Sequence, residues 1–140
     1  MASVVEDLKR VPLFSSLNER QLKRLAGRFR ERELQPGTAV VQERKMSGVG
    51  FFVITEGQAA VSVGGKEVAK LGPGDYFGEL ALISERERTA TVTAETRLQC
   101  LEIPFWDFRE FAMANPDVTW KLLQHVVELL TEEPPATDAA

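Results

Sequence analysis

The sequence predicts a mainly β domain with flanking helices. The predicted fold is an antiparallel β-barrel or jelly-roll (double-stranded β-helix), with N-terminal helices and a C-terminal helix pair. Between residues 30 and 103 the helical period mostly disappears. Short β-prone runs there are separated by turn signals every 8–12 residues or so, which is typical of sandwiches and barrels. On both sides of this region, apolar residues return to helical spacing.

The composition is that of an ordinary globular domain. The chain has 140 residues, of which 44% are hydrophobic and 27% charged, enough for one domain with its own core. A net charge of −4 argues against direct nucleic-acid binding, which needs a basic field. Cys100 is the single cysteine, and no apolar run reaches the roughly 18–20 residues of a membrane span. We expect a cytoplasmic protein without a membrane partner.

The N-terminal part, residues 1–29, is expected to form two short helices. Ser3 caps the first, with Glu6 as its capping-box partner, and Pro12 ends it. Asn18 caps the second, with Gln21 at the third helical position. The apolar face of this second helix comprises Leu22, Leu25, Ala26 and Phe29, at helical spacing. Its basic face is either a patch for nucleic acid or acidic membranes or, as we favour, a solvated surface with interleaved glutamates.

Residues 30–103 supply the strands of the barrel. The strand candidates are 38–42, 51–55, 59–63, 67–71, 89–92 and 98–103, most of them rich in β-branched or aromatic residues. Gly64-Gly65 lies between two of them and predicts a tight hairpin. Cys100 falls within the last strand and is expected to be a buried, inert thiol.

The C-terminal helix pair is predicted over residues 105–131, with a break at Asn115-Pro116. Its first helix has one apolar stripe, Phe105, Phe108, Phe111 and Ala112. Its second helix has two adjacent stripes, which are Trp120, Leu123, Val127 and Leu130, and Val118, Leu122, Val126 and Leu129. Because one stripe suffices to pack on the barrel, the other is left for a partner. The polar, proline-bearing tail, 132–140, is expected to be disordered.

The stretch from Gly72 to Ala94 holds the candidate binding site. Three glycines and a proline lead into one apolar helical turn, an all-charged loop and a β-prone run. The first N–H groups of such a turn are free to bind an anion. Gly78 lets the backbone approach a ligand closely, and Arg88 can bring its guanidinium group to the same anion.

Within this stretch, two runs resemble the phosphate-binding cassette of the cyclic nucleotide-binding domain family: F-G-E-L-A-L and, after five intervening residues, R-T-A-T-V. That domain occurs in regulatory subunits of cyclic-AMP-dependent kinase, bacterial catabolite activator proteins and cyclic-nucleotide-gated channels. The resemblance implies the same barrel with a C-terminal helical lid, over almost the whole of residues 1–131. The loop after the second strand departs from the family pattern, since Arg44-Lys45-Met46 follows Glu43.

The resemblance also implies the site residues, within a cassette spanning 77–92. Glu79 corresponds to the acid that binds the ribose 2′-OH, and Arg88 to the arginine that pairs with the cyclic phosphate. Backbone N–H groups near Gly78, Glu79, Leu80 and Ala90 complete the cradle. The full predicted set is Phe77, Gly78, Glu79, Leu80, Ala81, Arg88, Thr89 and Ala90. Thr89 bears on base selectivity, and we expect cyclic AMP to be favoured over cyclic GMP.

No catalytic or metal-binding constellation is recognisable, so we expect no enzyme, cofactor or metal. His125 is the only histidine and is expected at an ordinary helix flank. Three functions are considered. The chain is a cyclic-nucleotide sensor whose last helix docks a protein partner or forms a homodimer; or it is a regulatory fragment of a larger effector protein; or it is a barrel that has lost nucleotide binding and serves as a structural module.

Overall fold

The computed structural model describes residues 3–41, 50–78 and 90–131. In chain order, α1 (Val4–Lys9), the 3-10 turn η1 (Pro12–Phe14) and α2 (Glu19–Ala26) precede the strands. These are β1 (Arg30–Leu34), β2 (Ala39–Val41), β3 (Gly50–Glu56), β4 (Ala59–Val63), β5 (Lys66–Leu71), β6 (Tyr76–Phe77), β7 (Thr91–Ala94) and β8 (Leu98–Pro104). The helices α4 (Phe105–Ala114) and α5 (Pro116–Thr131) follow.

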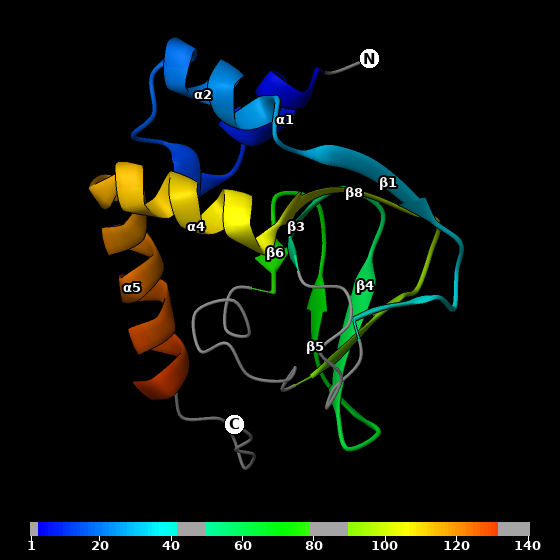
Figure 1. Cartoon of the computed structure of the whole chain (residues 1–140). Helices are drawn as coiled ribbons and strands as arrows, with labels where there is room; N and C mark the ends of the chain where they lie inside the picture. The colour runs from blue at the N-terminus through cyan, green and yellow to red at the C-terminus, as the bar shows by residue number, and fades with distance from the viewer. Residues whose placement is uncertain (1–2, 42–49, 79–89, 132–140) are drawn as a thin grey trace.

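The strands form two four-stranded antiparallel sheets. The order is β1-β8-β3-β6 in the first, here sheet A, and β2-β7-β4-β5 in the second, sheet B. Figure 1 shows α1, α2 and α4 gathered at one end of the strands, with α5 running down beside them. The predicted fold class, a mainly β roll with N-terminal helices and a C-terminal helix pair, is therefore confirmed.

Local sequence signals explain where the elements begin and turn. The Ser3 side chain accepts a hydrogen bond from the Glu6 N–H, and Asn18 and Gln21 form the predicted reciprocal capping box. At the predicted hairpin, Gly64 and Gly65 have φ of 60° and 82°, and Val63 pairs with Lys66 across the turn. Two positive φ values in a two-residue loop match the twist of the flanking strands.

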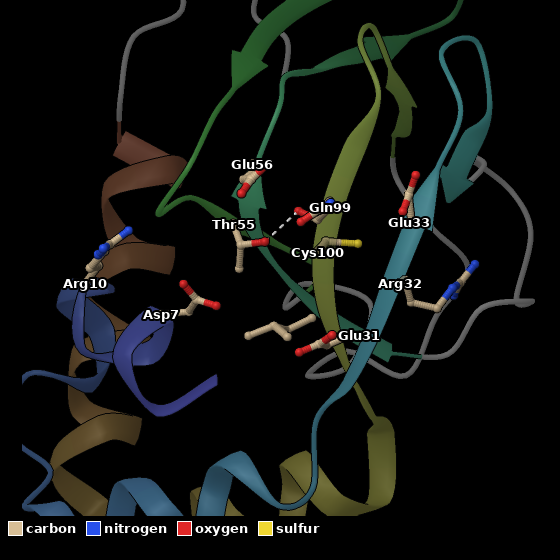
Figure 2. A pocket seen from close by; sticks show the side chains of 10 residues that line it. Asp7, Arg10, Glu31, Arg32, Glu33, Thr55, Glu56, Gln99 and Cys100 are labelled. Atoms are coloured by element: carbon tan, nitrogen blue, oxygen red, sulfur yellow. Dashed lines mark hydrogen bonds between the residues drawn. The ribbon is translucent and has the colours of Figure 1, made fainter. Parts of the chain in front are cut away.

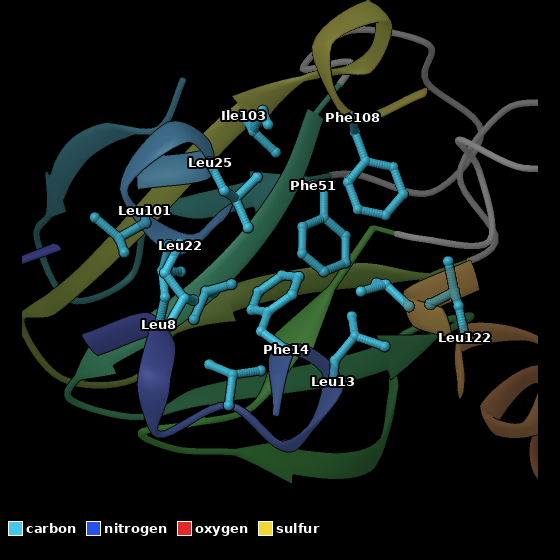
Figure 3. Packing of buried hydrophobic residues seen from close by; sticks show 13 residues of the cluster. Leu8, Leu13, Phe14, Leu22, Leu25, Phe51, Leu101, Ile103, Phe108 and Leu122 are labelled. Atoms are coloured by element: carbon cyan, nitrogen blue, oxygen red, sulfur yellow. The ribbon is translucent and has the colours of Figure 1, made fainter. Parts of the chain in front are cut away.

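Two clusters of buried side chains hold the fold together, and β3 and β8 contribute to both. The cluster between helices and sheet A, here the helix-layer core, comprises Leu8, Val11, Leu13, Phe14, Leu22, Leu25, Phe51, Val53, Leu101, Ile103, Phe108, Val118 and Leu122. Figure 3 draws the side chains of this cluster. The cluster between the two sheets, the barrel core, comprises Leu34, Val41, Phe52, Ile54, Ala59, Phe77, Val92, Ala94, Leu98 and Cys100. Alternate residues along β3 and β8 thus face opposite cores.

Ion pairs and side-chain hydrogen bonds tie the N-terminal helices to the C-terminal pair. The Arg28 guanidinium, just after α2, donates to Asp107 at 2.9 Å and to Glu110 at 2.5 Å, both on α4. The Gln21 amide donates to the Asn115 side chain at 3.3 Å, where α4 ends. The two ends of the described chain therefore form one helical layer over sheet A.

Candidate functional site

The predicted cassette begins at β6, a two-residue strand that we expected to be part of a glycine loop. Phe77 pairs with Phe52 and Tyr76 with Val53, which adds β6 to the edge of sheet A. The Phe77 ring stacks on Phe52 with centroids 4.9 Å apart and an interplanar angle of 8°. Phe77, the first residue of the predicted set, is therefore fixed in the barrel core.

The turn before β6 is held by its own backbone and by β3. The Gly72 N–H donates to the Asp75 carboxylate at 2.8 Å, and Asp75 and Gly74 exchange hydrogen bonds with the Ile54 backbone, each 2.9 Å long. Gly74 has φ of 92°, a conformation that other residues rarely adopt. The entry to the predicted cassette is thus a defined turn.

Gly78 and Ala90 are the described residues on either side of the cassette's centre. Gly78 has φ of 100°, in agreement with the need for glycine there. Ala90 is half-buried and precedes β7, whose Val92 pairs with both Val41 and Val61 in sheet B. The cassette therefore starts at the edge of sheet A and ends in the interior of sheet B. Its other predicted members, Glu79, Leu80, Ala81, Arg88 and Thr89, lie outside the described residues.

A cleft of about 410 Å³ lies elsewhere, between α1 and the outer face of sheet A. Figure 2 shows Asp7 and Arg10 on the helix side of this cleft, and Glu31, Glu56 and the Thr55–Gln99 hydrogen bond on the strand side. Burial, together with repulsion from Glu31 and Glu56, raises the pKa of Asp7 despite the nearby Arg10. Such a carboxylate-rich cleft disfavours an anionic ligand, so it does not compete with the cassette as a phosphate site.

The helix α5 presents one apolar stripe to the domain and the other to solvent. Val118 and Leu122 are buried in the helix-layer core, whereas Trp120, Leu123 and Val127 are 62%, 49% and 48% exposed. The sequence predicted that one stripe would be left over, and the structure identifies which. Among the described residues, no helix is long and apolar enough to cross a membrane.

Two further residues near the cassette were not part of the predicted site. Tyr76 faces the helices from β6, and the half-buried ring of His125 on α5 lies against it with centroids 5.2 Å apart. His125 was expected at an ordinary flank. The sequence signal for this contact was the aromatic pair Tyr76-Phe77 directly before Gly78. If these two residues form a strand, their rings face opposite sides of the sheet, so that one faces away from the barrel core.

In the described part of the chain, no group of three or more metal-ligating side chains is close enough to hold a metal ion. Cys100 is buried in the barrel core, and burial raises the pKa of its thiol to about 11. That value makes it a poor nucleophile, as expected from its place in the strand pattern.

Comparisons with known proteins agree on one family. Residues 31–115 match the family described as the cyclic nucleotide-binding domain. The regulatory subunit of cAMP-dependent protein kinase from Yarrowia lipolytica is 42% identical over 94 residues, or 66% of this chain and 25% of that protein. The one from Schizosaccharomyces pombe is 35% identical over 130 residues, or 92% and 29%. The regulatory domain of Toxoplasma gondii PKA, co-crystallised with cAMP, aligns with a TM-score of 0.80 at 27% identity, covering 89% of this chain and 49% of that one. The chain thus spans only 25–29% of the two curated relatives.

Proposed function

Because this chain belongs to the cyclic nucleotide-binding domain family, we propose that it binds a 3′,5′-cyclic nucleotide and acts as a non-catalytic, cytoplasmic sensor or regulatory module. The observation that carries the proposal is the run F-G-E-L-A-L to R-T-A-T-V, which lies within the matched residues and connects β6 to β7. We take residues 1–131 as the domain, 77–92 as its cassette and 132–140 as a tail.

Each cassette residue has a role in this proposal. Arg88 pairs with the cyclic phosphate, and Glu79 accepts a hydrogen bond from the ribose 2′-OH. Backbone N–H groups near Gly78, Glu79, Leu80 and Ala90 complete the phosphate cradle. Thr89 offers a hydroxyl to the ligand, and Phe77 and Ala81 complete the predicted set. The positive φ of Gly78 and the seating of Phe77 in the barrel core support a preformed start to this cradle.

The proposed ligand is cyclic AMP in preference to cyclic GMP. The Toxoplasma gondii structure contains cAMP, and both fungal relatives are named as cAMP-dependent. Thr89 follows Arg88 in the sequence and carries a hydroxyl. This hydroxyl can donate a hydrogen bond to the phosphate of either nucleotide, or accept one from the guanine amino group of cyclic GMP. The ratio of the two affinities is therefore part of the test.

The proposed output is a movement of α4 and α5 that changes what their exposed stripe contacts. That stripe, Trp120, Leu123 and Val127, has the 3–4 spacing with which apolar residues line a helix-pairing seam. A protein partner or a second copy of the chain fits such a seam, and direct nucleic-acid or membrane binding is not proposed. A second candidate is a regulatory fragment of a larger effector, favoured by the small share of the relatives that the chain spans.

Titration calorimetry with cyclic AMP and cyclic GMP tests the proposal. We expect saturable one-site binding. Arg88→Ala should weaken it by about 2–5 kcal/mol, or roughly thirty-fold to several thousand-fold, because a desolvated phosphate loses its charged partner. A 2′-deoxy ligand and Glu79→Ala should each weaken binding, and should not weaken it further when combined.

The matched control is Arg86→Ala, which removes the same charge two residues away in the sequence. It should leave the affinity within about two-fold, because the proposal gives Arg86 no contact with the ligand and a solvent-screened charge contributes little. Equal binding by wild type and Arg88→Ala would overturn the site, and absence of binding by wild type would favour the structural-module alternative.

A further inference from the structure

Four aromatic rings form a row from α5 to α4 across the outer face of sheet A. His125 on α5 lies 5.2 Å from Tyr76 on β6, Tyr76 lies 5.3 Å from Phe51 on β3, and Phe51 stacks on Phe108 of α4 at 4.5 Å, all measured between ring centroids. Figure 3 shows the last of these pairs, with the Phe51 and Phe108 rings face to face in the helix-layer core. Tyr76 is thus in contact with the core on one side and with α5 on the other.

Among the elements that carry this row of rings, β6 is the shortest. It has two residues, lies at the edge of sheet A and pairs there with β3. Its two rings face opposite ways, since Phe77 stacks on Phe52 in the barrel core while Tyr76 packs against the helix-layer core. Backbone pairing with β3 holds this short strand, and its two ring contacts add a link to each core.

The first half of α5 is fixed by other contacts. Val118 and Leu122 are buried in the helix-layer core, and the Lys121 ammonium donates to the Ser15 hydroxyl. His125 lies about one turn beyond Leu122, at a half-buried position, and its ring meets β6. The contact therefore joins the more distal part of α5 to the strand that leads into Gly78.

We propose that the Tyr76–His125 contact couples the position of α5 to that of β6, which makes His125 a positioning residue for the cassette. Tyr76 precedes Gly78 by two residues, so a displacement of the cassette backbone moves Tyr76, and through it α5. The reverse also holds, because coupling between two sites is reciprocal. The link to a ligand rests on the proposed function, whereas the coupling itself is a property of the ligand-free protein.

Amide hydrogen exchange of the full chain without nucleotide, resolved by residue, tests the coupling. In His125→Leu we expect exchange of the Tyr76 and Phe77 amides to rise about two- to tenfold, the factor associated with one aromatic pair. In Tyr76→Leu we expect a similar rise in the α5 amides from residue 122 to 128. The double variant should show no more than the larger single effect, because both substitutions remove the same contact.

Three matched variants separate coupling from general loosening. Tyr76→Phe and His125→Phe keep a ring at each position and should raise exchange less than the two leucine substitutions. Gln124→Ala changes the exposed neighbour of His125 on the same helix and should leave β6 unchanged. If His125→Leu leaves β6 exchange unchanged, or if Tyr76→Leu leaves α5 unchanged, the inference is wrong.

Cyclic AMP is then added to wild type and to His125→Leu, with binding and α5 exchange measured together. We expect both proteins to bind, and only wild type to show a change in α5 exchange on binding. A full α5 response in His125→Leu would overturn the role of His125 as a positioning residue. If wild type does not bind, the proposed function fails, and the ligand-free measurements still decide whether the coupling exists.

Discussion

The two cores differ in the range of the sequence from which their residues come. The barrel core takes all its buried residues from strands between Leu34 and Cys100, whereas the helix-layer core joins residues from Leu8 to Leu122. Both use β3, whose Phe51 and Val53 face one core and whose Phe52 and Ile54 face the other. The barrel is therefore built from the middle of the chain, and the helix layer is the region where the two ends of the described chain contact each other.

This difference separates the proposed binding site from the proposed output helix. The two described ends of the cassette belong to the barrel: Phe77 pairs with β3, and Ala90 leads directly into β7. The proposed output helix, α5, belongs to the helix layer. In the proposed function, a signal passes from one core to the other. The described strand β6 touches both, since its Phe77 lies in the barrel core and its Tyr76 packs against the helix-layer core.

The largest expected effect comes from truncating one ring in each core. Phe51→Ala and Phe52→Ala should each lower the free energy of unfolding by about 3–5 kcal/mol through lost burial and a cavity. Phe51→Ala should be the more severe, because Phe51 contacts both Phe108 and Tyr76, whereas Phe52 stacks on Phe77. Urea unfolding followed by circular dichroism measures both. A larger loss in Phe52→Ala would show that the barrel core is the more tightly packed.

The next effect separates two glycines in barrel turns. Gly57 and Gly37 have φ of 93° and 90°, but a Cβ on Gly57 would lie 2.3 Å from the Arg97 carbonyl oxygen, whereas Gly37 has open space. Gly37→Ala should cost about 1–2 kcal/mol for the left-handed conformation alone. Gly57→Ala should cost about 2–5 kcal/mol, since the backbone must also shift. Equal losses in thermal unfolding would contradict the predicted clash.

The third effect tests whether the barrel core excludes water, through the ionisation of the buried Cys100 thiol. Burial raises the pKa of its thiol from 9.0 to about 11, so the folded state retains a proton that the unfolded chain loses. The contribution to stability is therefore complete below pH 9.0 and declines as the pH rises toward 11. At about 1.4 kcal/mol per pH unit, the loss reaches roughly 2–3 kcal/mol. Unfolding of wild type and Cys100→Ala across this range should diverge in slope, and parallel curves would contradict the buried thiol.

The smallest effect lies at the surface of the helix layer. Arg28→Ala removes the ion pairs to Asp107 and Glu110, and should lower the stability only slightly because all three side chains are partly exposed. The loss should shrink as salt is added. Arg24→Ala, a neighbouring arginine on α2 without an ion pair in the described part of the chain, is the control. Equal salt dependence in the two variants would argue against a specific link between α2 and α4.

Sequence reasoning reached furthest where the signals are short-range. The Asn18–Gln21 capping box, the Gly64-Gly65 hairpin and the Phe108 stripe all formed as predicted, since each depends on residues a few positions apart. It was weakest at β6, where glycine-rich neighbours suggested a loop. Two residues carry too little periodicity to predict a strand, and its pairing with β3 is a long-range event.

The sequence by itself determined the family resemblance, the cassette and the residues proposed to bind phosphate and ribose. It also determined that α5 has more apolar surface than one interface needs. Only the tertiary structure decided which stripe is buried, and only it brought His125 against Tyr76. The physical reason is that helical spacing defines faces, whereas burial depends on what each face meets. What a face meets depends on the packing of segments that are far apart in the sequence. Tyr76 and His125, for example, are 49 residues apart.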